Sequence, residues 1–298
     1  MNIADELLHG AFDMHCHAYP EFSLEFPNRY KTADHLKLMQ EAGMGGVVLK
    51  SHFWPTVGIV DQIREQFSDM EIVSSITLNE CTGGLNLWAV EAAAKQNAKV
   101  IWLPTWSAQN DIDKKGISKT IANYIPTLSI ANNKGGYKMI DENGDVIPII
   151  YELFALCRDY DLLVCTGHIS PKESIVLAGI ANDIGLKKFI LSHPDSGSVG
   201  ATNEQIGEMV NLGMYIEICA LGITPIHYRI TPQRLKEIIT IAGPDRCVLS
   251  TDYFFEWASP APEQMRLLIS TLLHAGVTPY DINTMAKNVP RYLLNLEM

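Results

Sequence analysis

Short apolar runs alternate with amphipathic segments along the whole chain, and this alternation limits the fold more than any other feature of the sequence. Eight runs are apolar or β-branched and end in a polar or Gly/Pro-containing break: 11–17, 46–52, 72–79, 99–105, 162–168, 189–194, 214–220 and 247–253. Helical periodicity occupies the intervals, at 32–43, 56–67, 87–97, 149–160, 171–184, 203–212, 232–242 and 262–275, with a ninth segment near 279–294. Strands that are apolar on both faces suit a parallel sheet with a core on one side and helices on the other. The sequence therefore predicts an α/β fold, a (β/α)8 TIM barrel whose active site lies at the carboxyl ends of the strands.

Helix-end signals support these boundaries. Ser170 and Glu173 form a capping box around Pro171, which suits the first position of a helix. The same order of cap and proline recurs at Thr231-Pro232 and Thr278-Pro279. Glycines that suit helix ends stand at Gly43, Gly185, Gly213, Gly243 and Gly276.

One interval is longer than the others. After the fourth strand we expect an insertion of about 106–148, in which Asn143-Gly144 has the signature of a β-hairpin turn. Because it follows a strand's carboxyl end, it should overhang the active-site mouth as a lid or subunit contact. We expect one barrel domain over 1–298, and a separate second domain is the less favoured interpretation.

Composition narrows the functional classes. The formal net charge of −11 argues against a nucleic-acid binder, since phosphate backbones are met by basic surfaces. The six cysteines show no paired spacing, which predicts a reducing, cytoplasmic location. The acidic N-terminus and the lack of an apolar run of about 18 residues predict neither export nor a membrane anchor. We expect a small-molecule substrate and leave homo-oligomer formation open.

Histidines and an aspartate stand at the ends of separate apolar runs. In the first run, Asp13, His15 and His17 share one face, so both imidazoles can reach a single ion. Alone, such a pair is more often exposed or hydrogen-bonded. Three further candidate ligands end later runs: His168, His193 and Asp252. Groups of this kind, delivered from four strand ends to one place, predict a divalent-metal site with an open position.

At these residues the chain resembles the amidohydrolase superfamily. The matching positions are His15, His17, His168, His193, Asp252 and a closing segment, Asn288-Val289-Pro290-Arg291-Tyr292-Leu293-Leu294. The resemblance implies a distorted barrel with one or two divalent metals that hydrolyses amide, ester, lactone or phosphoester bonds or deaminates its substrate. Zinc is the first expectation, and manganese, iron, cobalt and nickel suit the same ligands. The ligands implied are His15, His17, His168 and Asp252. Asp252 would also take a proton from the attacking water, and His193 would bind a second metal or polarise the substrate.

The chain departs from that family after the fourth strand. Many members with two metals have a carboxylated lysine or a glutamate there, whereas this chain has Trp102 to Trp106 without such a ligand. Lys50 and His52, at the end of the second strand, could both point into the site. Lys50 would bridge two metals if carboxylated, bind a substrate carboxylate or oxyanion if cationic, or pair with Asp13.

Other candidates are less well defined by the sequence. Glu80, after the third strand, is either a site residue or a solvated loop charge. Glu217, within the seventh strand, is better explained as a paired structural carboxylate. Trp106 and Tyr253, with His52 and Lys50, are candidate substrate-binding residues, although aromatic packing under loops explains the two rings equally well. Three alternatives to a hydrolase stay open: a mononuclear decarboxylase or lyase, a TatD-like nuclease, and a barrel that binds without catalysis.

Overall fold

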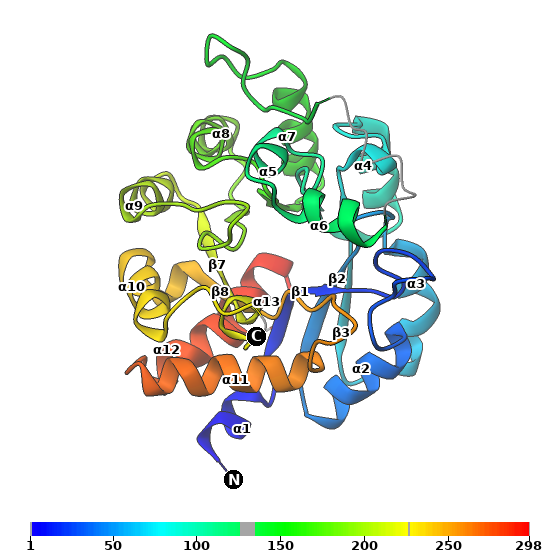
Figure 1. Cartoon of the computed structure of the whole chain (residues 1–298), viewed down its shortest axis with the longest axis vertical. Helices are drawn as coiled ribbons and strands as arrows, with labels where there is room; N and C mark the ends of the chain where they lie inside the picture. Colours follow the sequence, from blue (N-terminus) through cyan, green and yellow to red (C-terminus); the bar gives the residue numbers. More distant parts are fainter. Residues whose placement is uncertain (1, 126–134, 226, 298) are drawn as a thin grey trace.

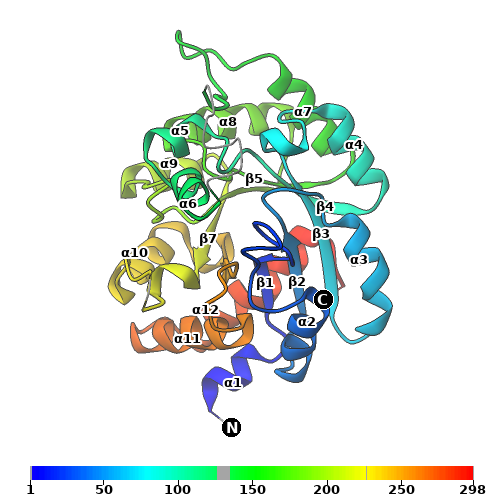
Figure 2. The ribbon, with the colours of Figure 1, turned by 45° about the vertical axis from the view of Figure 1, so that its right-hand side comes forward.

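Eight parallel strands surround a common interior in chain order, from β1 to β8, which confirms the predicted TIM barrel (Figure 2). The computed structural model describes residues 2–125, 135–225 and 227–297. The strands are β1 (Phe12–His17), β2 (Gly46–Lys50), β3 (Glu71–Thr77), β4 (Ala98–Trp102), β5 (Leu163–Cys165), β6 (Phe189–Leu191), β7 (Tyr215–Cys219) and β8 (Cys247–Ser250). Several end earlier than predicted, because the last residues of the apolar runs leave the sheet. His193 and Asp252, for example, have φ values of 26° and 53°, outside the range of a strand.

The barrel closes between its first and last strands just beyond the end of β8. The backbone N–H of Asp252 donates to the carbonyl of His15 at 2.8 Å, and that of His17 donates to the carbonyl of Tyr253 at 2.9 Å. These two hydrogen bonds join the carboxyl end of β1 to the segment that follows β8. Candidate site residues therefore lie directly on the closing seam.

Helices surround the strands (Figure 1). Their bounds are α1 (Ile3–Leu8), α2 (Thr32–Glu41), α3 (Val57–Ile63), α4 (Leu87–Lys95), α5 (Gln109–Asp113), α6 (Ile117–Tyr124), α7 (Ile149–Asp159), α8 (Pro171–Ile184), α9 (Asn203–Asn211), α10 (Pro232–Ala242), α11 (Ala261–His274), α12 (Pro279–Asn283) and α13 (Val289–Leu294). Short 3-10 turns occur at Arg64–Gln66, Glu80–Thr82, Ala220–Ile223 and Pro244–Arg246. A π turn, Thr284–Asn288, separates α12 from α13 within the segment expected as one helix. Pro290 lacks the N–H that would continue the ordinary ladder, which explains the wider turn before it.

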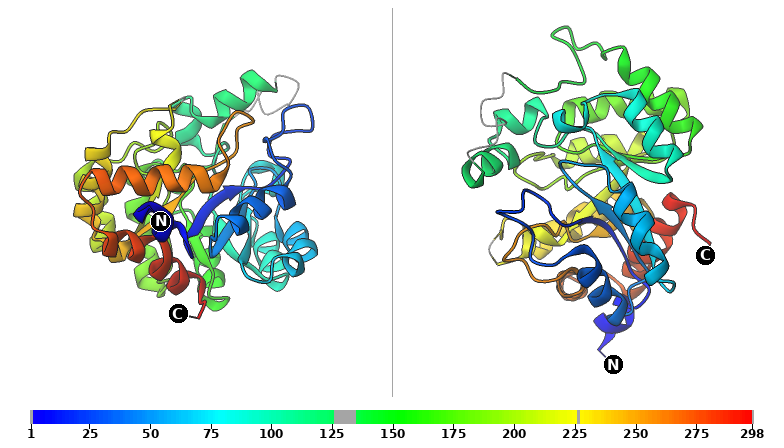
Figure 3. Two further views of the ribbon diagram at one scale, coloured as in Figure 1. Left: turned by 90° about the horizontal axis from the view of Figure 1, so that it is seen from below. Right: turned by 90° about the vertical axis from the view of Figure 1, so that its right-hand side faces the viewer.

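The interior of the barrel is a packed core. Side chains from alternating strand positions fill it, among them Met14, Val48, Val73, Val100, Trp102, Leu163, Ile190 and Val248. Val289, Leu293 and Leu294 of α13 pack against the same cluster. The two termini lie in different places on the surface (Figure 3). None of the helices in the described part of the chain has the length and apolar character needed to cross a lipid bilayer.

The segment after β4 carries two short helices, α5 and α6, before the 126–134 stretch that lies outside the described residues. Beyond it, Ile140 and Val146 form an isolated antiparallel bridge, and the N–H of Asp141 donates to the carbonyl of Asp145 at 2.8 Å. This turn surrounds the Asn143-Gly144 pair. Whether the whole segment acts as a lid stays a prediction.

Candidate metal centre

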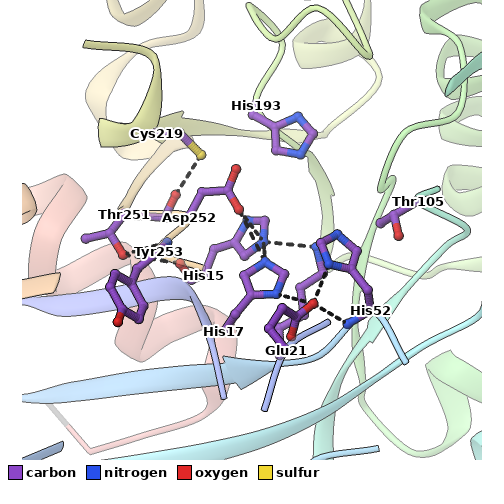
Figure 4. Close-up of polar contacts among 12 residues, drawn as sticks. His15, His17, Glu21, His52, Thr105, His193, Cys219, Thr251, Asp252 and Tyr253 are labelled. Atoms are coloured by element: carbon purple, nitrogen blue, oxygen red, sulfur yellow. Dashed lines mark hydrogen bonds and ion pairs between the residues drawn. The ribbon is translucent and has the colours of Figure 1, made fainter. Parts of the chain in front are cut away.

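Polar atoms of His15, His17 and Asp252 meet at the carboxyl end of the barrel (Figure 4). His15 Nε2 lies 3.1 Å from His17 Nε2 and 3.1 Å from Asp252 Oδ1, and His17 Nε2 lies 3.3 Å from the same oxygen. Lys50 Nζ lies 2.9 Å from His15 Nε2. Two ligands of one tetrahedral zinc ion, each bound at about 2.0–2.1 Å, stand about 3.3–3.4 Å apart. The spacing of the two imidazoles and the carboxylate therefore fits a single divalent ion.

Buried carboxylates hold the opposite ring nitrogens of these imidazoles. His15 Nδ1 lies 2.9 Å from Glu217 Oε1, and His17 Nδ1 lies 3.0 Å from Glu21 Oε1. At His15, the hydrogen bond between Nδ1 and Glu217 keeps the proton on Nδ1 and leaves the Nε2 lone pair for a metal. The Nε2 atoms of His15 and His17 lie only 3.1 Å apart, so either a proton or a metal ion must lie between their lone pairs. The donor chemistry of the residues present thus fits a metal ion.

The same arrangement recurs at two further histidines. Asp111 Oδ1 lies 2.6 Å from His168 Nδ1, and Glu21 also contacts His52 Nδ1. Asp111 lies in α5, and it also accepts from the N–H groups of Ile117 and Ser118 at the start of α6. The segment after β4 is in this way tied to a candidate ligand on the loop after β5.

Charges in this cluster shift the pKa values of the carboxylates. Burial would raise the pKa of Glu21, but the imidazoles of His17 and His52 hold it well below its usual range. Burial would also raise the pKa of Asp252, but His15, His17 and His193 hold it far below its usual range. Glu217 differs, because burial raises its pKa. Asp252 is consequently a carboxylate at neutral pH.

His193 stands at the end of β6 without a carboxylate on its ring. Its backbone N–H donates to Glu217 Oε2 at 2.9 Å, and within the described residues its buried Nδ1 has no hydrogen-bond partner. Ligand atoms of His15, His193 and Asp252 all lie within 4.8 Å of one another. The ring of His193 packs 4.9 Å from that of His168. Burial lowers the pKa of His193 to about 3, so the ring is neutral and can offer a lone pair.

Lys50 lies inside the barrel rather than beside Asp13. Its Nζ stands 4.5 Å from the ring of Trp102, which comes from β4 and fills the space under His15. Asp13 instead accepts the N–H of Thr251 at 2.9 Å and its hydroxyl at 2.5 Å. Burial raises the pKa of Asp13 to about 7. Asp13 therefore anchors the residue before Asp252, and no ion pair with Lys50 forms.

A cavity of about 250 Å³ opens above these residues. His52, His168, His193 and Asp252 reach it, and Phe254 and Phe255 form its apolar side. Lys50 lies beneath it. Trp106 and Tyr253 are buried away from it: the indole N–H of Trp106 donates to the carbonyl of His52 at 3.3 Å, and the hydroxyl of Tyr253 accepts from the N–H of Tyr30. These two rings support the walls, and their expected contact with substrate has no geometric support.

The cavity also contains residues that sequence patterns did not single out. Lys114 and Lys115 from the turn after α5, and His227 and Arg229 from the segment after β7, line it. Glu80, in contrast, lies outside it and contacts the hydroxyl of Tyr137. These residues lie in irregular segments whose position over the barrel depends on the tertiary fold, so no periodic signal identifies them.

Comparisons with known proteins agree with the barrel. An amidohydrolase from Pseudomonas aeruginosa superposes with a TM-score of 0.62 at 10% identity, over 98% of this chain and 98% of that one. The probable dipeptidase PvdM from the same organism gives 0.66 at 12% identity, over 98% and 96% of the two chains. A 2,6-dihydroxybenzoate decarboxylase from Rhizobium gives 0.60 at 11%, over 96% and 99%.

These structures cover nearly the whole chain, so the barrel fold expected from the resemblance is confirmed. A search of curated proteins finds no match to this sequence. A family model, described as a family of unknown function and called DUF6282, matches residues 10–217. This chain is a member of the DUF6282 family and folds as an eight-stranded parallel α/β barrel.

Proposed function

We propose that this protein is a metal-dependent hydrolase that acts on an amide, ester, lactone or phosphoester bond of a small molecule. The observation that carries the proposal is the approach of Asp252 Oδ1 to within 3.3 Å of both His15 Nε2 and His17 Nε2. A carboxylate and two imidazoles with free lone pairs bind divalent cations in hydrolytic sites. A cavity of about 250 Å³ suits a small substrate and is too small for a polynucleotide.

The proposed primary ligands are His15, His17 and Asp252, with zinc as the metal we expect first. His168 and His193 complete a second position or face the substrate. The chemical state of Lys50 distinguishes a second metal position from a substrate-facing role for these two histidines. A positively charged Nζ only 2.9 Å from His15 Nε2 would compete with a metal, so Lys50 must be neutral or carboxylated when the metal is bound. A carboxylated Lys50 would bridge two ions.

When bound, a divalent ion supplies a Lewis acid that activates water at neutral pH. Asp252 is the proposed general base, because it is ionised and borders the cavity. Glu217 fixes the tautomer of His15 and also holds the backbone of His193. His193, neutral and directed into the cavity, is placed to polarise the group under attack. Asp13 sets the position of Asp252 through Thr251.

A decarboxylase or lyase with one metal is the second candidate. It is favoured by Trp102, whose ring lies on β4 next to Lys50 and offers no ligand that could bridge two ions. A structurally similar barrel, the Rhizobium protein, is described as a 2,6-dihydroxybenzoate decarboxylase. The two reactions differ in their products, so one screen can separate them.

The test combines metal content with turnover. We expect the purified protein to contain one or two transition-metal ions per chain and to hydrolyse members of an ester, lactone, amide and phosphoester panel. Asp252→Asn should lower kcat by a factor of about 100 or more, since general bases contribute 10²–10⁴-fold. Asp183→Asn, at an exposed position of α8, is the matched control and should leave kcat unchanged.

Three results would count against the proposal. Carbon dioxide release from aromatic carboxylates without hydrolysis would favour the decarboxylase. Failure to bind added zinc would remove the metal centre, and full activity of Asp252→Asn would remove the assigned base. Two ions per chain that fall to one in Lys50→Met would support the carboxylated bridge.

A further inference from the structure

The cavity above the metal centre is positively charged in a chain that is strongly acidic overall. Lys114, Lys115 and Arg229 line it, and among the described residues Asp252 is its only carboxylate. The chain as a whole carries a formal charge of −11. Positive side chains gathered around one small cavity are therefore not a consequence of composition.

These cations have no carboxylate partner within the described residues. Lysine and arginine ion pairs elsewhere in that part of the chain involve Lys37, Arg158, Lys188, Arg234 and Arg266. Lys114 Nζ donates to the backbone carbonyl of Val199, which leaves its charge uncompensated. Arg229 acts electrostatically on Asp195, but no nitrogen of Arg229 comes within 4.0 Å of that carboxylate, whose pKa burial raises to about 6.

Neutral donors stand beside the cations. Ser196, Gly197 and Ser198, from the segment after β6, line the same cavity, as does Thr120 of α6. Hydroxyl and backbone N–H groups next to lysine and arginine are the usual partners of carboxylate and phosphate oxygens. Phe254 and Phe255 supply an apolar side.

We propose that the substrate is an organic anion, whose carboxylate or phosphate binds Lys115 and Arg229 while its reacting bond lies at His193 and Asp252. This inference rests on the proposed function for the position of the reacting bond, but the anion subsite itself stands on the cavity charges. The carboxylate of Asp252 already contacts the imidazoles of His15 and His17, and it forms no ion pair with Lys115 or Arg229. Lys115 and Arg229 are therefore left to neutralise a charge that the substrate brings.

The experiment measures anion binding to the zinc-loaded full-length protein by calorimetry. The probes are succinate, inorganic phosphate and succinamide, the last as a neutral analogue of succinate. The variant Lys115→Gln/Arg229→Gln removes both charges from exposed positions and should fold normally. The control, Lys119→Gln/Arg158→Gln, lowers the net charge equally at exposed sites outside the cavity.

We expect succinate, phosphate or both to bind, and succinamide to bind at least tenfold more weakly. The cavity variant should raise the Kd of the anion by about tenfold or more, because it removes both charged donors that would pair with the anion. The control variant should retain the original Kd. Binding of succinate alone identifies a carboxylate, and binding of phosphate alone identifies a phosphate group.

Equal binding of succinamide and succinate, or equal losses in the cavity and control variants, would overturn the anion subsite. So would the absence of binding by both anions. Zinc content is measured on the same samples. A protein that takes up succinate through Lys115 and Arg229 but holds no zinc would contradict the proposed hydrolase and leave the subsite intact.

Discussion

Glu217 is the residue on which the geometry of the centre depends most. One of its oxygens accepts from His15 Nδ1 at 2.9 Å and from the Ser250 hydroxyl at 2.8 Å, and the other accepts from the His193 backbone. It therefore fixes a candidate ligand from β1, the end of β6 and a residue of β8 at once. Interactions of this kind orient metal ligands without contacting the metal.

We predict that Glu217→Gln weakens zinc binding by about 10–100-fold, since loss of such a partner reduces metal affinity by that factor. The Kd for zinc, measured by competition with a chelator, checks this. Glu208→Gln at an exposed position of α9 is the control. An unchanged Kd in Glu217→Gln, with normal folding, would show that His15 is not a ligand.

The sequence was informative about individual site residues only where they end an apolar run. His15, His17 and Asp252 were found in this way, and the structure brings them together. Glu21 and Asp111 were not found, because they lie in segments without periodicity. Their contacts with histidines are set by the tertiary fold. The tautomers that they impose follow from tertiary contacts alone.

At the scale of elements, His35 joins two helices. It lies in α2, and its Nε2 accepts the N–H of Ala261, the first residue of α11, at 2.9 Å. Burial lowers the pKa of His35 to about 3. In the unfolded chain a histidine titrates near 6.5, so below that pH only the unfolded state takes up this proton. The contribution to stability is complete above pH 6.5 and is lost as the pH falls toward 3.

We therefore predict that His35→Gln, whose amide oxygen can still accept from Ala261, reduces the acid sensitivity of folding. Between pH 7 and pH 5 the wild-type free energy of unfolding should fall by about 2 kcal/mol more than that of the variant. Urea unfolding of chelator-treated protein at both pH values measures the difference. His274→Gln, at an exposed position of α11, should behave as wild type. Parallel pH profiles for His35→Gln and wild type would rule out the buried neutral imidazole.

Elements with explicit end signals were predicted best. The structure has α8 at the expected 171–184, with both hydrogen bonds of the Ser170 capping box. The sequence missed α1, which has only six residues and too few turns to show a period. It also placed strand ends too late, because apolar character continues past β5 and β6 into residues whose backbone has left the sheet.

For the whole molecule, the candidate metal centre and the closing seam coincide. His15 and His17 lie on β1, and Asp252 follows β8, where its backbone N–H bonds to His15. A ligand that binds only the folded state stabilises it, by about 4 kcal/mol at a concentration 1,000 times its Kd. A metal held by both sides of the seam can therefore stabilise the entire barrel.

We predict that zinc at that concentration raises the Tm by about 8 °C, at roughly 2 °C per kcal/mol for a chain of this size. Scanning calorimetry with and without zinc measures the shift. Asp252→Ala should lose most of it, whereas Asp183→Ala should keep it. A zinc-induced shift of the same size in Asp252→Ala would place the ion away from the seam.

The seam also sets an order of events during synthesis. The ribosome makes His15 and His17 well before Asp252, so the growing chain carries only half of the candidate centre until Asp252 is added. The two halves meet only after the segment beyond β8 has left the exit tunnel. A metal that needs both halves would therefore bind only after Asp252 is made, and a chain truncated before Asp252 would have no means of completing the proposed site.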